Sequence, residues 1–271
     1  MIPKAHIDAW RASVPWAADH QVEQDLVISR AIVELFSDPF IRDRLAFRGG
    51  TALYKLHLPA ARYSEDIDLV QTTAEAIGPS LDALRARLDP WLGVPKREFS
   101  EGRVTLTYRF DAEGEPPVRL KLKVEINTRE HFTVYGLQSF RFAVSSRWFT
   151  GEADVVGYTL DEQLGTKLRA LYQRRKGRDL YDLWDGIARG GASPERIVTA
   201  FSAYMQAEGH AISRAQFEEN LALKLRDERF RTDVVALLRV GFAWDPDEGG
   251  ALVGRELVAR LSGLGWKGGG G

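Results

Sequence analysis

The stretch Phe47–Val70 reads FRGGTALYKLHLPAARYSEDIDLV, and its two ends decide the fold. Near its start, the pair Gly49-Gly50 stands where the pattern predicts a turn into a helix. Near its end, acidic and apolar residues alternate at the beginning of a predicted strand, Ile67–Val70. On such a strand Asp66 and Asp68 project from the same face, while the apolar side chains point the other way into a core.

The glycine pair has two possible roles. Glycines at a helix entry let backbone N–H groups approach an anion closely, and the positive end of the helix dipole favours negative charge there. The alternative is an ordinary helix entry capped by Thr51. The glycines alone do not decide between the two roles.

The Asp66 and Asp68 carboxylates favour a metal site. Two carboxylates side by side repel each other, and a divalent cation between them removes that repulsion. The alternative is a solvated strand edge that carries acidic residues. We favour the metal site because the chain turns apolar directly after the second acid.

A third carboxylate is expected from the segment Leu120–Ile126, which alternates strictly between apolar and charged residues. Its charged face carries Lys121, Lys123 and Glu125. Glu125 joins the aspartate pair if this strand is their neighbour in the sheet. An exposed polar face without a metal is equally compatible with the segment.

The rest of the chain divides into two regions. Short alternating segments separated by turns dominate up to about Val156, and longer helical periods follow Thr159. The predicted strands are Ile67–Val70, Val104–Phe110, Leu120–Ile126 and Phe140–Val144. The predicted helices lie in Asp8–Leu58 and at Pro79–Trp91, Leu160–Gln173, Asp179–Ala188, Pro194–Gln206, Arg214–Leu225, Thr232–Val240 and Glu248–Leu261. We therefore expect an α+β protein with a mixed sheet in residues 1–157, a helical domain in residues 158–267, and a flexible glycine tail at residues 268–271.

Composition excludes several classes of protein. The chain has 271 residues, 37 Lys plus Arg against 38 Asp plus Glu, and no cysteine. A nearly neutral chain has no overall basic coat for nucleic acid, and a chain without cysteine forms no disulfide, thiolate nucleophile or thiolate zinc site. There is no P-loop motif, the five histidines are scattered, and no apolar stretch approaches membrane-spanning length. We expect a cytoplasmic protein without a membrane segment.

The predicted helix Leu160–Gln173 carries a candidate phosphate ligand. Its leucines form a core stripe, and Lys167 lies at the margin of that stripe. From there its stem is expected to be buried while its ammonium stays free to reach a phosphate. An ordinary surface lysine with a buried stem is the alternative. Downstream, Asp179 is expected in the first turn of a helix, where it stabilises the dipole, and Asp182 is expected to pair with a nearby arginine.

The densest positive run of the chain overlaps this region. It contains six basic residues and no acid, namely Lys167, Arg169, Arg174, Arg175, Lys176 and Arg178. The run is compatible with a solvated helix end, where cations favour the C-terminal dipole, and equally with a surface that holds RNA phosphates.

Four segments of the sequence resemble one known family. GGTALYKLH, RYSEDIDLV, KVEIN and EQLGTKLRALYQRRKGRDLYDLW, which together run from Gly49 to Trp184, resemble in content and order the AbiEii/AbiGii toxins. These are nucleotidyltransferase-like toxins of bacterial toxin–antitoxin and phage-defence systems, within the DNA polymerase β nucleotidyltransferase superfamily. The spacing from Gly50 to Asp66 is longer than is usual in that superfamily but is similar to this family.

The resemblance implies a fold, an activity and roles for residues. It implies a polymerase-β-like nucleotidyltransferase domain, Mg²⁺ or Mn²⁺ as cofactor, an NTP as substrate and a separately encoded antitoxin. It also implies an RNA acceptor, with a tRNA 3′ end as the expected one, whose modification blocks translation and growth. The implied metal ligands are Asp66, Asp68 and Glu125. The implied ligands of the NTP phosphates are Gly49, Gly50, Thr51, Ser64 and Lys167.

The implied catalytic residues are Asp66, Asp68, Lys167 and Asp179, with Asp182 beside them. With an RNA acceptor, the predicted RNA contacts are Arg174, Arg175, Lys176 and Arg178.

Asp179 is expected to orient either Lys167 or the acceptor. Two other functions stay open at this point. A kinase-like phosphotransferase would use the same carboxylates but release a nucleoside diphosphate. A non-catalytic nucleotide- or RNA-binding protein would not need both Asp66 and Asp68.

Overall fold

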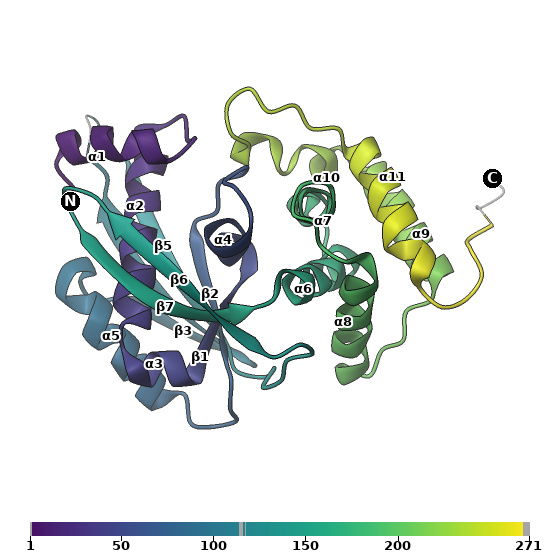
Figure 1. The fold of residues 1–271 in the computed structure, drawn as a ribbon, viewed down its shortest axis with the longest axis horizontal. Helices are drawn as coiled ribbons and strands as arrows, with labels where there is room; N and C mark the ends of the chain where they lie inside the picture. Colours follow the sequence, from purple (N-terminus) through teal and green to yellow (C-terminus); the bar gives the residue numbers. More distant parts are fainter. Residues whose placement is uncertain (1, 114–115, 117, 268–271) are drawn as a thin grey trace. The chain divides into compact units, whose positions relative to one another are not determined.

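The computed structural model of the chain describes residues 2–113, 116 and 118–267 (Figure 1). The expected glycine tail at residues 268–271 lies outside this range. The chain divides into two compact units, residues 1–158 and 159–271. Within the described residues, every helix is too short or too polar to span a lipid bilayer.

The first unit is built on a seven-stranded mixed sheet, as expected for an α+β fold. Its strand order is β3-β4-β5-β2-β1-β7-β6. Strands β2 and β5 run parallel, as do β1 and β7, and the other neighbours are antiparallel. The strands are β1 (Leu45–Arg48), β2 (Asp66–Gln71), β3 (Lys96–Ser100), β4 (Arg103–Asp111), β5 (Arg119–Asn127), β6 (Leu137–Ser145) and β7 (Thr150–Tyr158).

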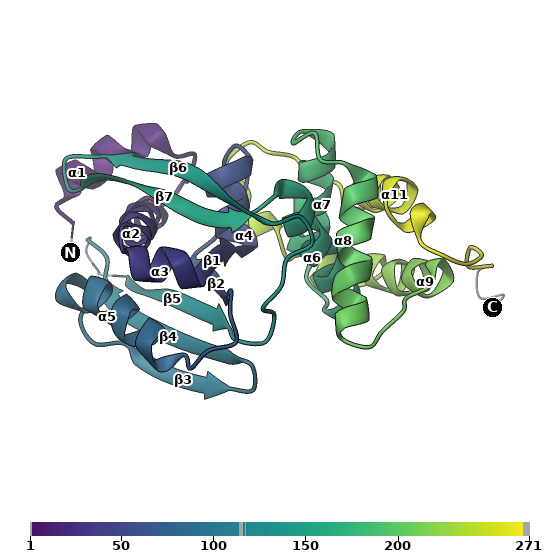
Figure 2. The same cartoon turned by 60° about the horizontal axis from the view of Figure 1, so that its bottom comes forward.

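Helix α2 lies inside the curve of this sheet. It contacts strands on both sides of the sheet's centre, including β5 and β7 (Figure 2). A second helix, α5, packs against β4, where the Tyr108 hydroxyl donates a hydrogen bond to Asp89 (2.9 Å). The helical segments of this unit are α1 (Lys4–Trp10), a 3-10 turn (Arg11–Ser13), α2 (Asp19–Phe36), α3 (Pro39–Arg44), α4 (Gly49–Ala52), the π-helical turn η2 (Leu53–His57) and α5 (Gly78–Leu92).

Three strands lie where the sequence patterns predicted none. The sequence patterns place β1 within a helical region, because the apolar run Leu45-Ala46-Phe47 shows no alternation. In the structure all three residues are buried, which explains why no polar residue alternates with them. Strand β3 is polar and fully exposed, and β7 contains two glycines and two acids. Pairing with neighbouring strands, not local propensity, places these segments in the sheet.

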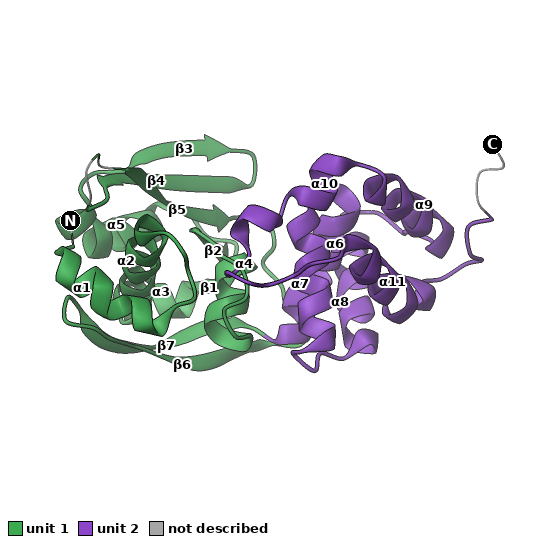
Figure 3. Ribbon diagram, turned by 90° about the horizontal axis from the view of Figure 1, so that it is seen from above, with its two compact units in different colours: residues 1–158 green, residues 159–271 purple. Residues whose placement is uncertain are grey.

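The second unit is helical, as predicted (Figure 3). Its elements are α6 (Leu160–Gln173), α7 (Gly177–Ala188), α8 (Pro194–Ala207), α9 (Arg214–Leu225), α10 (Glu228–Thr232), a 3-10 turn (Val235–Leu237), α11 (Pro246–Glu256) and a second 3-10 turn (Val258–Arg260). Helix α6 begins at a Thr159 cap whose hydroxyl accepts a hydrogen bond from the backbone N–H of Glu162.

The predicted helix Thr232–Val240 is wrong. The chain leaves α10 at Thr232 and makes only one 3-10 turn before an extended stretch. Directly after this stretch, Gly241 has a φ of +75°, which ends any helical path, and the rings of Phe242 and Trp244 lie 5.9 and 5.1 Å from that of Tyr181 on α7. Tertiary contacts with α7, which local periodicity does not reveal, therefore hold the chain that follows.

Helices α6 and α8 touch at a glycine. A Cβ atom on Gly165 would lie 2.5 Å from the Cβ of Ala200 and 3.0 Å from the backbone nitrogen of Phe201. Both neighbours belong to α8, and both are buried. The two helix backbones therefore approach each other at this point more closely than any side chain permits.

We expect Gly165→Ala to lower the free energy of unfolding of the protein by about 1–3 kcal/mol, because the added methyl group must push the two helices apart. Thermal or urea unfolding followed by circular dichroism measures the change.

The matched control is Gly254→Ala on α11, where an added Cβ meets no atom within 4 Å. That variant should gain helix propensity and raise the free energy of unfolding by up to about 1 kcal/mol. Equal effects of the two substitutions would contradict the close α6–α8 contact.

Candidate active site

The glycine turn between β1 and α4 is shaped around Asp68. Gly49 has a φ of +85°, a conformation that side chains rarely adopt. A Cβ atom there would also overlap the Asp68 carboxylate, lying 2.8 Å from its Cγ. Because β1 and β2 pair with Arg48 opposite Asp68, the backbone at the start of α4 lies directly against this carboxylate. Gly49 is required at this position for both reasons.

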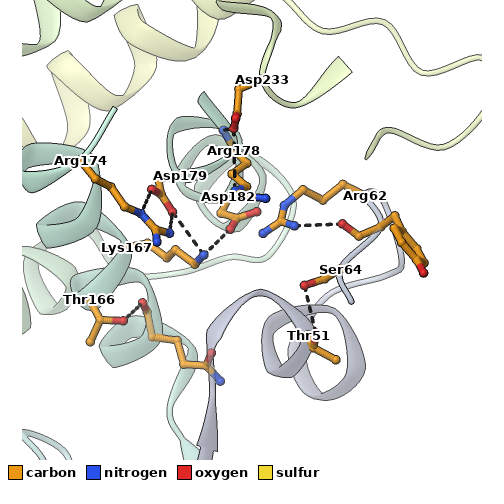
Figure 4. A network of polar contacts seen from close by, with 12 residues as sticks. Thr51, Arg62, Ser64, Thr166, Lys167, Arg174, Arg178, Asp179, Asp182 and Asp233 are labelled. Carbon is orange, nitrogen blue, oxygen red and sulfur yellow. Dashed lines mark hydrogen bonds and ion pairs between the residues drawn. The ribbon is translucent and has the colours of Figure 1, made fainter. Parts of the chain in front are cut away.

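The rest of the turn is tied to the strand that carries the acids. The Thr51 hydroxyl donates a hydrogen bond to the backbone carbonyl of Asp66 (2.5 Å) and lies 3.0 Å from the Ser64 hydroxyl (Figure 4). A Cβ atom on Gly50 would lie 2.6 Å from a guanidinium nitrogen of Arg62 and 2.9 Å from the Ser64 hydroxyl oxygen. The single Thr51 proton is therefore used within the fold, and the Thr51 oxygen accepts the hydrogen bond from the Ser64 hydroxyl.

Asp66 and Asp68 share one face of β2, as the alternation predicted. The residues between and after them, Ile67, Leu69 and Val70, are buried in the core. The parallel pairing of β2 with β5 sets Asp66 beside Lys123 and Asp68 beside Glu125. The predicted neighbouring strand is therefore confirmed, and Glu125 lies on the same face as the aspartate pair.

The environment of Asp66 opposes its charge. Burial, and then the nearby Asp68 carboxylate, raise the pKa of Asp66 to about 6, against the lowering effect of the Lys123 ammonium. One of its oxygens, Oδ1, is buried and has no hydrogen-bond partner among the described residues. A carboxylate oxygen left in this state is suited to a hard cation, which prefers oxygen ligands and supplies the missing positive charge.

Glu125 is already engaged by cations. Its carboxylate lies 3.0 Å from the Lys123 ammonium and 3.6 Å from the Arg103 guanidinium. Within the described part of the chain, no three Asp, Glu, His or Cys side chains are arranged to hold a metal ion. The two aspartates share one face of β2 with Glu125 beside them, and all three stay predicted metal ligands.

The second unit holds a compact charged cluster (Figure 4). The Lys167 ammonium lies 2.9 Å from Asp182 Oδ2 and 3.3 Å from Asp179 Oδ1. Both carboxylates are fully buried. Arg174 completes the cluster by donating two hydrogen bonds to Asp179, from Nε (2.7 Å) and Nη2 (2.8 Å).

This cluster corrects one expectation and bears on another. The Lys167 stem is buried as predicted, but its ammonium is not free, because two carboxylates hold it. Asp179 contacts Lys167 directly, so between the two expected roles the contacts favour orienting the lysine. Burial disfavours the charge of Asp179, yet Lys167 and Arg174 together keep the pKa of Asp179 below its ordinary value.

Asp182 pairs with Lys167, which comes from the preceding helix, α6. The arginine partner expected for Asp182 from helical spacing stays a prediction.

The cations of the basic run have acidic partners. Arg174 forms an ion pair with Asp179, as described above. The other ion pairs are Arg169 with Glu208, Arg175 with Asp227, and Lys176 and Arg178 with Asp233. Arg169 is also buried and lies over the ring of Tyr204. The sequence run contains no acid, but the fold brings acids to it from later helices. Its contact with RNA stays a prediction.

Sequence reasoning missed two residues of the first unit. Arg62 is buried against Gly50 and lies 5.3 Å from the centre of the Tyr54 ring. Lys123 is the cation beside Asp66. The alternation of the β5 segment already placed Lys123 on the face of Glu125, so its sequence did contain a signal. Nothing comparable marked Arg62.

Comparisons with known proteins agree with this geometry. The sequence model of the family described as "Nucleotidyl transferase AbiEii toxin, Type IV TA system" matches residues 30–249. No curated protein matches the chain.

Solved structures share the fold at low sequence identity. The nucleotidyltransferase toxin MenT4 from Mycobacterium tuberculosis is 17% identical, with a TM-score of 0.64 over 97% of this chain and 91% of that one. A putative nucleotidyltransferase from Helicobacter pylori is 16% identical, with a TM-score of 0.56 over 89% of this chain and 94% of that one. The family match covers most of the chain and includes the glycine turn, the aspartate pair and the Lys167 cluster, so the chain belongs to the AbiEii family of nucleotidyltransferase toxins of type IV toxin–antitoxin systems.

Proposed function

We propose that this nucleotidyltransferase toxin transfers a nucleotidyl group from an NTP to an RNA hydroxyl, with a tRNA 3′ end as the acceptor and Mg²⁺ or Mn²⁺ as cofactor. The modification would block translation and growth, and a separately encoded antitoxin would counteract it. The observation that carries the proposal is the Asp66–Asp68 pair beside the glycine turn. The Gly49 backbone lies so close to the Asp68 carboxylate that any side chain at position 49 would overlap it.

The reaction is a displacement at phosphorus. The acceptor hydroxyl oxygen forms a bond to the α-phosphorus, the bond from that phosphorus to the bridging oxygen breaks, and pyrophosphate leaves. Asp66, Asp68 and, as the third predicted ligand, Glu125 would hold divalent cations, which lower the pKa of the attacking hydroxyl and neutralise charge on the phosphates when bound.

The residues of the glycine turn bind and orient the triphosphate in this proposal. Backbone N–H groups at Gly49 and Gly50 and the Ser64 hydroxyl contact phosphate oxygens. Thr51 acts indirectly, because its hydroxyl fixes the backbone of Asp66 (2.5 Å) and so the spacing between the turn and the carboxylates.

Lys167 stabilises the leaving group in this proposal. An ammonium has three N–H donors, and Asp179 and Asp182 account for two of them. The third donor is the one assigned to pyrophosphate, whose charge increases as the bond breaks. Asp179 and Asp182 are positioning residues that fix the direction of this donor.

Two labelled nucleotides test the reaction type. Incubation of the protein with RNA, Mg²⁺ and each NTP labelled at the α-phosphate should put label into RNA and release pyrophosphate. Transfer of label from the γ-phosphate, with a nucleoside diphosphate as product, would show a kinase instead. Binding of NTP and RNA without transfer of either label would show a non-catalytic protein.

A first prediction concerns Asp66→Asn and pH, in the absence of metal. The folded protein raises the pKa of Asp66 from 3.8 to about 6, so the folded state favours the protonated acid. The contribution of this group to stability is therefore fully present below about pH 4 and is lost as the pH rises through about 6. At neutral pH the free energy of unfolding of Asp66→Asn should exceed that of the wild type by about 1–2 kcal/mol, because the substitution removes a half-buried charge.

The check is a series of thermal unfolding curves across this pH range in a metal-free buffer. The exposed Asp82→Asn variant on α5 is the matched control and should follow the wild type at every pH. A stability difference between Asp66→Asn and wild type that does not change with pH would contradict the burial of the charge.

A second prediction concerns Asp68→Ala and divalent cations. We expect transfer to be lost and the fold to be retained, because the substitution removes one of two repelling carboxylates. In the wild type, excess EDTA should abolish transfer, Mg²⁺ or Mn²⁺ should restore it, and added Mg²⁺ should raise the melting temperature as a ligand of the folded state does.

The melting temperature of Asp68→Ala should respond much less to Mg²⁺. This readout does not depend on the RNA or on the NTP. Full wild-type transfer in EDTA, or an unchanged response of the variant to Mg²⁺, would overturn the metal site.

A third prediction concerns Lys167. Lys167→Ala removes the ammonium that lies between two buried carboxylates, and we expect the free energy of unfolding to fall by about 3–5 kcal/mol. Lys167→Arg keeps the positive charge and should recover much of this stability. It should not recover transfer, because the guanidinium directs its donors differently from an ammonium.

Urea unfolding and labelled-NTP transfer, measured on both variants, separate the two effects. If Lys167→Arg transfers nucleotides as fast as the wild type, a specific role of the ammonium at the leaving group is wrong. If Lys167→Ala is as stable as the wild type, the buried ion cluster is not as described.

A further inference from the structure

One face of strands β3, β4 and β5 carries an excess of positive charge. The register of these strands places alternate residues of all three on the same face as Asp66 and Asp68. The basic members are Lys96, Arg103, Arg109, Arg119, Lys121 and Lys123, and the acidic members are Glu98, Asp111 and Glu125. We call this set the basic sheet face. Its excess is notable in a chain whose formal net charge is −1.

The basic sheet face is open to solvent. Helices α2 and α5 pack on the opposite side of these strands, where the alternating residues of β4 and β5 are buried. On the basic sheet face, by contrast, the Arg103 and Arg119 side chains are 57% and 73% exposed. Thr107, which lies between Lys96 and Lys123 in the register, is its buried member. The charged side chains are thus available to a ligand.

Two neighbouring cations on this face have no acidic partner. Arg109 and Lys121 stand directly opposite each other on β4 and β5, and both are exposed. Among the described residues neither side chain forms an ion pair, whereas Arg103, Arg119 and Lys96 each have an acid within 4 Å. Like charges directly opposite on paired strands destabilise a sheet. The pair is therefore explained better by a polyanionic ligand than by the fold itself.

This face continues from the proposed site of nucleotidyl transfer. Lys123 is the register partner of Asp66, and Lys121 lies two residues before it on β5. With about 4.8 Å between strands and about 3.3 Å per residue, the backbone of Lys121 lies about 8 Å from that of Asp66, and Arg109 lies one strand further away. An acceptor that lies along this face therefore places its reactive hydroxyl at the aspartates while its neighbouring phosphates reach these cations.

We propose that the RNA acceptor lies across the basic sheet face and is held there through its phosphates by Arg109 and Lys121, with Lys123 nearest to the reacting end. The inference rests on the proposed function, since it assumes an RNA acceptor. It differs from the contact predicted for Arg174–Arg178, whose cations are each paired with an acid of the second unit.

The chemistry of the face also predicts the kind of recognition. Its described members are charged residues, serine, threonine and asparagine, and none is aromatic. Stacking of bases is therefore not available on it, and phosphate contacts dominate. We expect binding that depends strongly on salt and little on RNA sequence.

The test measures RNA binding by the full chain across a salt series from about 50 to 200 mM. The probes are end-labelled bulk tRNA and two short single-stranded RNAs of different sequence. The variant Arg109→Ala with Lys121→Ala should weaken binding to all three probes and lower the log–log salt slope by about 1.4, which corresponds to two lost contacts with single-stranded RNA.

Two further double variants remove the same number of charges elsewhere. Lys4→Ala with Arg147→Ala takes two exposed cations from α1 and from the β6–β7 turn, and its salt slope should equal that of the wild type. Arg175→Ala with Lys176→Ala tests the rival surface in the second unit, and its slope should change less than that of the Arg109 and Lys121 variant. A melting temperature at or above that of the wild type confirms that the sheet variant is folded, because it removes a like-charge pair.

The outcomes separate this inference from the proposed function. If the wild type binds none of the RNA probes, the RNA acceptor itself is wrong. If the wild type binds RNA and the sheet variant keeps the full salt slope, the inference is overturned and the proposed function survives. If the sheet variant binds RNA normally but no longer forms a stable complex with the separately encoded antitoxin, the face is a protein-docking surface and the inference is also overturned.

Discussion

The close approach of the Gly49 backbone to the Asp68 carboxylate is the constraint on which the first unit depends. Strand β1 must deliver the chain to α4 directly beside β2, and only a residue without a side chain leaves room for the acid. The hydrogen bond from Thr51 to the backbone of Asp66 then fixes the spacing on the other side of the turn. The glycine turn is therefore necessary for the geometry of the carboxylates, independently of any phosphate that it contacts. This explains why the two features occur together.

The two units hold their buried charges in opposite ways. In the first, Asp66 has an oxygen without a hydrogen-bond partner among the described residues and a pKa raised to about 6, so the fold disfavours the charged form of this carboxyl group. In the second, Lys167 and Arg174 surround Asp179, and their charges keep its pKa low despite complete burial. The first arrangement is suited to binding an ion from solution. The second is suited to holding one ammonium in a fixed direction, because all of its counter-charges come from the chain itself.

Ion pairing, not the number of basic residues, distinguishes the two positive surfaces. The run that ends at Arg178 is the densest in the sequence, yet later helices supply it with Asp227 and Asp233. The basic sheet face is less conspicuous in the sequence because its cations come from three strands. There, within the described part of the chain, Arg109 and Lys121 form no ion pair. Exposed ion pairs contribute little stability and exchange readily, so the second unit can still meet an anion. A polyanion gains most, however, where no counter-charge has to be displaced.

Sequence patterns alone predict the α+β plan, the placement of Asp66 and Asp68 on one strand face, and the neighbouring strand that carries Glu125. These features depend on alternation and glycine chemistry, which are local properties of the chain. Only the tertiary structure decided that Leu45–Arg48 is a strand, because a short and fully buried apolar run has no period that separates strand from helix. It also decided that Lys167 is bound by two acids and that the basic run is neutralised, since those partners lie on other helices. Local periodicity predicts which face a residue occupies, but the partner that meets that face is set by packing between elements distant in sequence.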